Sequence, residues 1–295
     1  MLIHNFIVDF KKILIGYGFY AGILLTTIMC IFSPVYYNFF NSENYTFIKC
    51  LIEYDKEDML NDASLSSYNV AIQGAHGFLS MFAPIIVAFA SVPVFCDEYN
   101  SGNARFIILR TNKRKYRVSK YLSSSICGGM VLWCGFCIYI VSSYIFFPDI
   151  SNYSLEIKNT FEESIKQSYP NFVQYGYWYV LLRISIEIFF YGVMTTIPSI
   201  ILTSFVKNKY IIICLPFFLK YVIVQTCNKL SSESMEKSLN NHLLNVIKTV
   251  NPDSLSNISI YPNLNNKIIG FNIALFVVGL ILFTIISEAK YDCGE

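Results

Sequence analysis

The sequence predicts an all-α integral membrane protein with six transmembrane helices, an interfacial helix at the N-terminus and a short cytoplasmic helix. Hydrophobic residues make up 54% of the 295 residues, and charged residues only 14%. The mean hydropathy is +0.47, above what a soluble domain sustains. Apolar residues also gather into runs long enough to cross a bilayer. We therefore expect one transmembrane domain over residues 1–295.

Six apolar runs define the expected spans, which are residues 15–37, 76–95, 121–147, 172–206, 210–226 and 268–286. A membrane-crossing helix needs about 20 apolar residues. The second run contains Pro84 and Pro93, which a membrane helix tolerates where neighbouring helices satisfy the freed backbone groups. The fourth run is the longest, and we expect a tilted or kinked extension at Pro198.

The first 13 residues carry apolar side chains at a spacing of three to four. Asn5, Asp9, Lys11 and Lys12 fall on the opposite side. This pattern predicts an amphipathic helix in the membrane interface. Because no small-residue cleavage site follows the first apolar run, we expect that run to be an anchor and not a removable signal peptide.

The distribution of Lys and Arg predicts the orientation. The loop 96–120 is the most basic, with Arg105, Arg110, Lys113, Arg114, Lys115, Arg117 and Lys120. The polar segment 38–73 holds two lysines against six acidic residues. Positive charge stays inside, so we expect this loop, the turn 207–209 and both termini in the cytoplasm. The polar segments 38–73, 148–171 and 228–267 would lie outside a bacterial plasma membrane.

Motifs of soluble enzymes are missing from the sequence: it has no GxxxxGK[ST], GxGxxG, HExxH or GxSxG. The histidines are scattered at positions 4, 76 and 242, which does not favour a histidine-based metal or base site. The net charge of +2 does not indicate a nucleic-acid partner. We therefore expect neither an enzyme nor a metal site.

The nine cysteines lie mostly inside apolar runs, where a thiol behaves as a small hydrophobe. Cys134 and Cys137 have the CxxC spacing but sit within an expected span without a second ligand pair, which favours packing over a metal or redox role. Cys50 and Cys227 both fall on the expected outer side, so a disulfide between them is left open.

Three ionisable residues lie within expected spans: Arg183 and Glu187 in the fourth, and Lys220 in the fifth. Burial of charge in hydrocarbon is unfavourable, so such groups pair or face a cavity. One interpretation is a translocation path for substrate or ions. The other is structural, since Arg183 and Glu187 are four residues apart and share a helix face. Lys220 would then bond to a neighbouring helix or extend toward the interface.

The basic loop 96–120 is not uniformly polar. Glu98 and Gly102 close the second span, residues 105–109 form a short apolar turn, and a basic run from Lys113 leads into the third span. The simpler interpretation is a solvated loop that obeys the charge rule. The alternative is a short amphipathic helix whose apolar side docks into a groove on a partner protein.

This arrangement resembles the permease subunits of ABC transporters of the ABC-2 type. In that family, an acidic residue, a Gly-Thr pair, an apolar turn, Pro-Ser-Arg and a Lys follow one another after the second span. The matching residues are Glu98, Gly102, the turn 106–109, Arg114 and Lys120. The sequence departs at Asn103, where Thr is usual, and at Asn112 and Lys113, where Pro-Ser is usual.

The resemblance implies that this loop forms a coupling helix on a separate ABC ATP-binding subunit. The coupling residues would be Glu98, Gly102, Arg105, Phe106, Leu109, Arg110, Arg114 and Lys120. The partner would hold ATP and magnesium, and this chain would bind no cofactor directly. A second permease chain, identical or related, would face this one in the lipid bilayer. The expected function is export of an amphipathic substrate such as a peptide, antibiotic or lipid.

Two other function classes remain as alternatives. An ion- or proton-coupled secondary carrier would use Arg183, Glu187 and Lys220 and would need no ATPase. An integral membrane enzyme would need a nucleophile, metal or acid-base cluster at the membrane boundary, and the sequence offers none.

Overall fold

The computed structural model describes residues 2–38, 42–101, 107–108, 112–168, 172–206, 208–236, 241–256 and 264–292. Five of its helices are long and apolar enough to cross a membrane, and a bent pair of helices at the N-terminus supplies a sixth candidate span. The predicted class, a helical multi-pass membrane protein, is therefore confirmed. The described residues also contain a two-stranded sheet, which the sequence did not predict.

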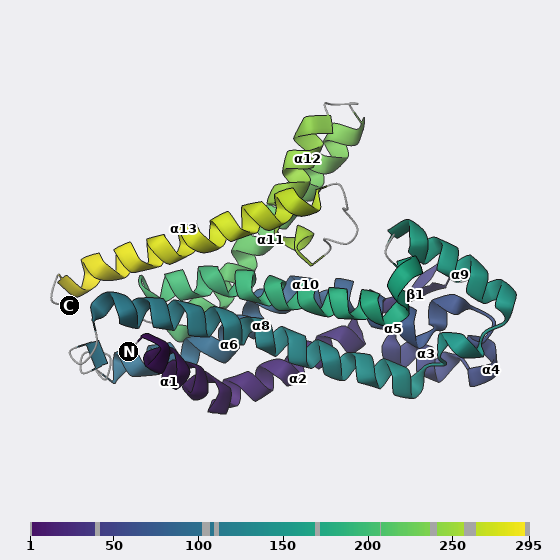
Figure 1. Cartoon of the computed structure of the whole chain (residues 1–295), viewed down its shortest axis with the longest axis horizontal. Helices are drawn as coiled ribbons and strands as arrows, with labels where there is room; N and C mark the ends of the chain where they lie inside the picture. The colour runs from purple at the N-terminus through teal and green to yellow at the C-terminus, as the bar shows by residue number, and fades with distance from the viewer. Residues whose placement is uncertain are drawn as a thin grey trace.

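The bent pair consists of α1 (Leu2–Ile15) and α2 (Tyr17–Phe32). The five long helices are α6 (Phe78–Asn100), α8 (Lys113–Phe146), α10 (Phe172–Thr203), α11 (Lys209–Glu236) and α13 (Asn265–Asp292). Helices α2, α6, α8 and α10 pack together into the main bundle, along the long axis of the molecule (Figure 1). Both termini lie at the same end of this bundle, together with the end of α6 and the start of α8. Both ends of a chain lie on the same side when the number of spans is even.

The first span is shorter than predicted because the helix ends before residue 37. Helix α2 ends at Phe32, and Ser33 has an extended backbone. Pro34, whose ring removes a backbone donor, opens strand β1 (Pro34–Asn38). This strand pairs antiparallel with β2 (Glu43–Thr46). At its other end, α2 meets α1 at a 60° bend, where Gly16 is extended.

Helices α6, α8, α11 and α13 extend beyond the predicted limits of their spans, whereas α10 stays within residues 172–206. Helix α8 begins eight residues before 121, and α11 continues ten residues past 226, because polar residues prolong both helices. In the fourth span, the backbone leaves helical geometry at Gly176, with φ 73° and ψ −170°. Only a glycine adopts this positive φ without strain, and the sequence did not predict a kink there. Pro198, where a tilted or kinked extension was expected, lies inside the same helix.

The long helices α8 and α10 approach closely because glycines face each other. A Cβ on Gly192 would lie 2.8 Å from the carbonyl oxygen of Gly128 and from the Cα of Gly129. No side chain fits in that space. Small residues at helix crossings are typical of membrane proteins, where close backbone contact replaces the hydrophobic effect as the packing force.

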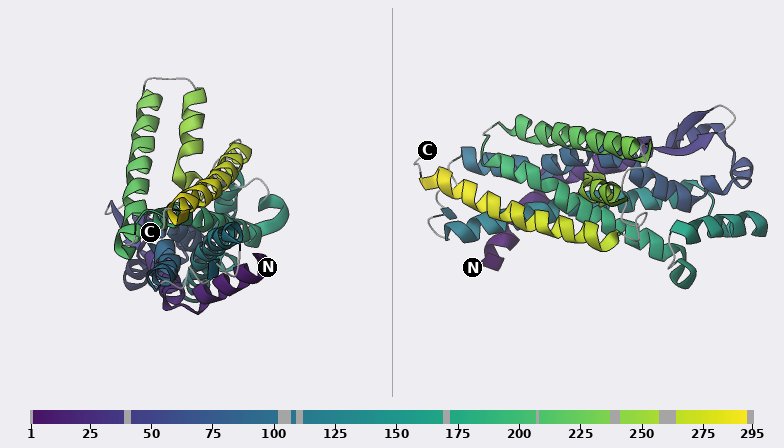
Figure 2. Two further views of the ribbon diagram at one scale, coloured as in Figure 1. Left: turned by 90° about the vertical axis from the view of Figure 1, so that its left-hand side faces the viewer. Right: turned by 90° about the horizontal axis from the view of Figure 1, so that it is seen from above.

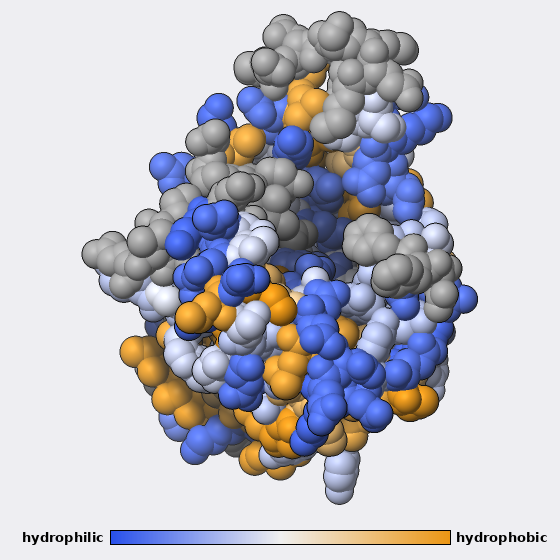
Figure 3. Space-filling view, turned by 90° about the vertical axis from the view of Figure 1, so that its right-hand side faces the viewer, coloured by the Kyte–Doolittle hydropathy of each residue, from blue (hydrophilic) through white to orange (hydrophobic). Residues whose placement is uncertain are grey.

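The polar segments between the spans are folded into short helices. These are α3 (Phe47–Glu53), α4 (Lys56–Met59), α5 (Ser67–His76), α9 (Leu155–Ser168) and α12 (Asn241–Val250), with 3-10 turns η1 (Ala63–Leu65), η2 (Ile150–Asn152) and η3 (Pro252–Ser254). Tyr45, Phe47 and Tyr68 are buried among them and extend the hydrophobic core beyond the spans. Figure 3 views the end of the molecule that carries β1, α3, α4, α5 and α9, and shows hydrophilic residues over much of its surface.

The C-terminal part of the chain packs against the bundle over part of its length. The first half of α11 lies against α6, and α13 contacts α8 and α10. Beyond these contacts, α11 and α13 splay away from the bundle, and α12 projects to one side (Figure 1; Figure 2, left). Seen from above, α12 is viewed end-on while α8 and α10 lie along the page, so α12 runs across the bundle (Figure 2, right). Most apolar side chains in the span windows of α11 and α13 are exposed, which fits contact with lipid.

Candidate functional site

Three helices bring charged side chains together at the end of the bundle that holds both termini. Helix α1 supplies Asp9 and Lys12, which are three residues apart and therefore on one face. Helix α6 supplies Glu98, two residues before its end. Helix α8 supplies Ser119 and Lys120 from its second turn. The site thus lies at the base of the loop that joins α6 to α8.

Lys120 is the centre of this cluster. Its Nζ lies 2.8 Å from Asp9 Oδ1 and also forms an ion pair with Glu98 Oε2. Lys12 Nζ binds the other oxygen of Glu98, at 2.7 Å. Ser119 Oγ donates a hydrogen bond to Asp9 Oδ2, with a distance of 2.6 Å. Below we call Asp9, Lys12, Glu98, Ser119 and Lys120 the inner ion cluster.

The inner ion cluster is largely shielded from solvent and is electrically balanced. Lys120 is 4% exposed and Asp9 is 6% exposed, whereas Lys12 lies at the surface. The ring of Phe95 covers the Lys120 ammonium, with the centroid 4.8 Å from Nζ. Two carboxylates and two ammonium groups cancel in charge. Removing one member would leave buried charges without compensation, which is strongly unfavourable.

The structure joins two of the predicted coupling residues and leaves a third at the surface. Glu98 and Lys120, at the two ends of the loop, contact each other directly. Arg114 is exposed at the start of α8, where its backbone N–H is capped by Asn112 Oδ1 at 3.1 Å. The predicted residues outside the described part of the chain are Gly102, Arg105, Phe106, Leu109 and Arg110. Within the predicted short helix, residues 107–108 are described and helical.

Asp9 and Arg117 are buried, although the sequence predicted that both would face solvent. Asp9 was expected on the polar face of the N-terminal helix, but it points into the protein toward Lys120. Arg117 was grouped with the solvated basic loop, but it is 2% exposed and donates from Nη1 to the carbonyl of Thr284 in α13 at 3.2 Å. The sequence contained one signal for the special position of Asp9, which is the sole acidic residue in positions 1–42.

The three intramembrane charges form two groups. Arg183 Nε lies 3.1 Å from Glu187 Oε1, so these residues do pair along α10. Lys220 pairs instead with Asp253 Oδ1, at 2.7 Å, and also contacts the hydroxyl of Tyr191. Asp253 was not expected, because it lies in the polar segment before the last span. Tyr191 lies one helical turn beyond Glu187, so α10 carries Arg183, Glu187 and Tyr191 on successive turns.

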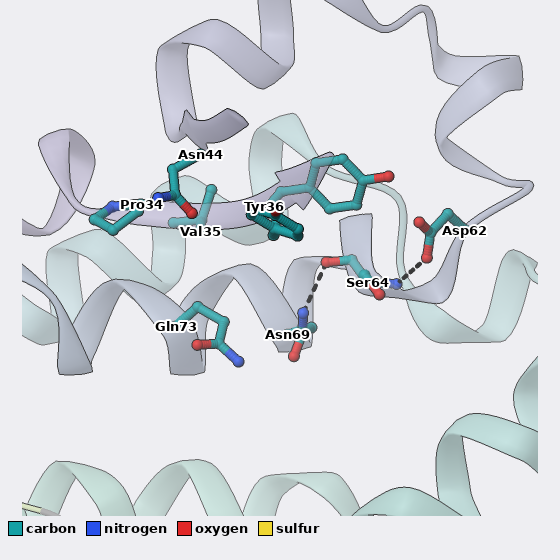
Figure 4. Close-up of a pocket in the computed structure, with 9 residues that line it drawn as sticks. Pro34, Val35, Tyr36, Asn44, Asp62, Ser64, Asn69 and Gln73 are labelled. Carbon is teal, nitrogen blue, oxygen red and sulfur yellow. Dashed lines mark hydrogen bonds between the residues drawn. The ribbon is translucent and has the colours of Figure 1, made fainter. Parts of the chain in front are cut away.

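The folded polar segments line an open pocket of about 310 Å³ (Figure 4). Its lining comes from β1, β2 and the chain around α5, and comprises Pro34, Val35, Tyr36, Tyr37, Asn44, Asp62, Ser64, Asn69 and Gln73. Asp62 Oδ1 accepts a hydrogen bond from Ser64 N at 2.8 Å. Burial and a hydrogen bond to Asp62 raise the pKa of the Tyr36 hydroxyl above its ordinary value.

Cysteine and metal chemistry gain no support from the geometry. Cys50 and Cys227 are both buried free thiols, so the disulfide left open above is not formed. Burial raises the pKa of Cys50 to about 12, which makes its thiol unreactive at neutral pH. Cys134 and Cys137 are also free. Among the described residues, no group of three or more His, Cys, Asp or Glu is arranged to hold a metal ion.

The chain matches no protein-family model, and comparison with curated proteins finds no match.

Proposed function

We propose that the chain is the membrane-spanning permease subunit of an ATP-driven exporter. A separate ABC ATP-binding subunit would bind the α6–α8 loop and hydrolyse ATP with magnesium. A second permease chain, identical or related, would complete the translocation path. The substrate class that we propose is amphipathic, such as a peptide, antibiotic or lipid. The chain would lie in the plasma membrane with the loop and both termini in the cytoplasm.

The inner ion cluster is the observation that supports this proposal. A loop that transmits force must be attached firmly at both of its ends. Glu98 and Lys120 lie at those two ends and form an ion pair with each other. Asp9 and Lys12 add α1 to the same cluster. A push on the loop would therefore move α1, α6 and α8 together.

Close packing would carry the same movement further. Helix α8 begins beside the loop and contacts α10 through Gly128 and Gly192 without intervening side chains. Packed interfaces of this kind shift between discrete arrangements more readily than they deform. Movement at the loop would thus reach the helix that carries Arg183 and Glu187.

Co-purification with the neighbouring ATPase tests the proposal. The full chain and the ATPase encoded beside it are expressed together, and the chain is isolated through a tag. We expect the ATPase to be retained and its hydrolysis rate to change on binding. An Arg114→Glu variant, which reverses an exposed charge beside the loop, is expected to weaken retention. If the unaltered chain neither retains the ATPase nor changes its rate, the proposal fails.

A second candidate function is an ion- or proton-coupled carrier. The observation that favours it is the row of Arg183, Glu187 and Tyr191 on successive turns of α10, which continues to Lys220. Such a carrier would transport in vesicles that lack any ATPase. Glu187→Gln would then abolish transport, whereas in a permease with a structural ion pair it would leave the transport rate close to that of the parent.

A further inference from the structure

A buried ammonium group lies where the segment 251–256 returns to the bundle. Lys220 of α11 is 8% exposed. Its Nζ lies 2.7 Å from Asp253 Oδ1 and donates to the Tyr191 hydroxyl of α10 and to the Ser80 carbonyl of α6. Tyr191 in turn donates to the Ser80 carbonyl at 2.7 Å and lies 3.0 Å from Asp253 Oδ1. Four separate elements therefore meet at one cation.

The Ser80 carbonyl is available to Lys220 because of Pro84. In a helix, the carbonyl of residue 80 would accept a hydrogen bond from the N–H of residue 84. Proline has no N–H, so that bond cannot form. In an apolar span the freed carbonyl needs another donor. Lys220 and Tyr191 supply two donors, and the proline in α6 thereby prepares an acceptor for the ammonium.

Asp253 is held in place by the structure of its own segment. It lies in η3, where Asn251 Oδ1 accepts a hydrogen bond from its backbone N–H at 3.1 Å. Pro252 restricts the preceding backbone. Leu255, two residues later, is buried in the main hydrophobic core. The carboxylate is therefore presented to Lys220 by a structured turn and not by a free loop.

The chain between Lys220 and Asp253 forms the part of the molecule that leaves the bundle. The second half of α11 and all of α12 project to one side (Figure 1; Figure 2, left). Their outer surface carries exposed apolar residues, including Val222, Leu230, Leu243 and Val246. Lys220 marks the point where the chain departs, and Asp253 marks the point where it returns. Their ion pair closes the base of this projecting hairpin.

We propose that the Lys220–Asp253 ion pair is a pin that holds the α11–α12 hairpin and η3 against the bundle. Detachment of η3 would strand an ammonium group among apolar helices, which is strongly unfavourable. The hairpin therefore has an attached state and a detached state, with few intermediates between them. This inference rests on the contacts alone and does not depend on the proposed transport function.

Hydrogen exchange of the full chain in detergent micelles tests the pin. The variant Asp253→Asn removes the negative charge while keeping the size of the side chain. We expect amides of α12 to exchange at least about tenfold faster than in the parent, because the attached state loses its ion pair. Amides of α8 are expected to exchange at the parent rate, which shows that the bundle is still folded.

Two further variants make the test specific. Lys229→Met removes an exposed lysine from the same helix and should leave α12 exchange within about twofold of the parent. In the double variant Lys220→Met/Asp253→Asn, exchange should exceed that of Asp253→Asn by less than about twofold, since the pair is already broken. Parent-like α12 exchange in Asp253→Asn, or exchange in the double variant that exceeds that of Asp253→Asn by more than about twofold, would overturn the pin.

Discussion

Lys120 Nζ of α8 lies 2.8 Å from Asp9 Oδ1 of α1, and both residues are almost fully buried. In the sequence, Asp9 comes before the first span and Lys120 comes after the second. Lys120 also binds Glu98 of α6, so a single ammonium holds three helices together. This relationship explains why an N-terminal helix with many exposed apolar residues packs against α8 instead of lying only on the lipid surface.

Removal of the Lys120 charge should destabilise the protein. Lys120→Met leaves Asp9 and Glu98 buried with less compensation, for which we expect a loss of about 3–5 kcal/mol in the free energy of unfolding. Lys115→Met, an exposed lysine in the first turn of the same helix, should change it by less than about 0.5 kcal/mol. Denaturant unfolding in micelles measures both. Equal losses in the two variants would contradict a central role for Lys120.

Neutralising Asp9 should loosen α1 while leaving the bundle intact. Asp9→Asn weakens the contacts to Lys120 and Ser119, and we expect a cost of about 1–3 kcal/mol for the attachment of α1. Trypsin cleavage after Lys11 or Lys12 should become faster. Asn5→Ala, a substitution on the same helix that changes no charge, serves as the control. An unchanged cleavage rate in Asp9→Asn would show that α1 is held by other contacts.

Because α8 and α10 cross closely, we expect a single added methyl group at the crossing to destabilise the protein. In Gly192→Ala the new Cβ would lie 2.8 Å from the Gly128 carbonyl, so the helices must separate. We expect a destabilisation of about 1–3 kcal/mol. Gly270→Ala is the matched control, because a Cβ there meets nothing within 4 Å. In α13 that change should be neutral or stabilising by up to about 1 kcal/mol, by helix propensity. Thermal unfolding distinguishes the two.

His76 should make stability depend on pH. It ends α5 outside the candidate spans, and burial lowers the pKa of its imidazole below the ordinary value of 6.5. Below pH 6.5 the unfolded chain therefore binds a proton that the folded chain does not. Stability should fall as the pH drops from 6.5 and level off once the pH passes the lowered pKa of the folded state.

The variant His76→Asn isolates this contribution. We expect its unfolding free energy to change less than that of the parent between pH 7.5 and pH 5. Denaturant unfolding at a series of pH values gives the comparison. Identical pH profiles for the parent and the variant would assign the pH dependence to other groups.

The sequence predicted the helical membrane class and the approximate positions of the spans, because hydropathy over a window of about 20 residues depends on local composition. It was less reliable at the boundaries. The first span ends at Phe32 because Ser33 and Pro34 start a strand, although the apolar run continues. The fourth span has a break at Gly176, which the sequence did not predict because a single glycine in an apolar run does not reveal its backbone conformation.

The contacts at the candidate sites were also predicted only in part from the sequence. The spacing of Arg183 and Glu187 was sufficient to predict that they share a helix face, because helical neighbours follow from the 3.6-residue period. Glu98 and Lys120 were identified by their order in a motif, but their direct contact was not. Asp253 was missed, since nothing near it in the sequence indicates that it reaches Lys220.

By itself, the amino-acid sequence determined that this chain belongs in a membrane, where its helices run and which segment between them is the most basic. The tertiary structure decided which charges meet. Asp9 with Lys120, and Lys220 with Asp253, become partners only when helices from distant parts of the chain pack together. The physical reason is that burial in lipid is a local property of each helix, whereas the compensation of a buried charge depends on the neighbour that packing places beside it.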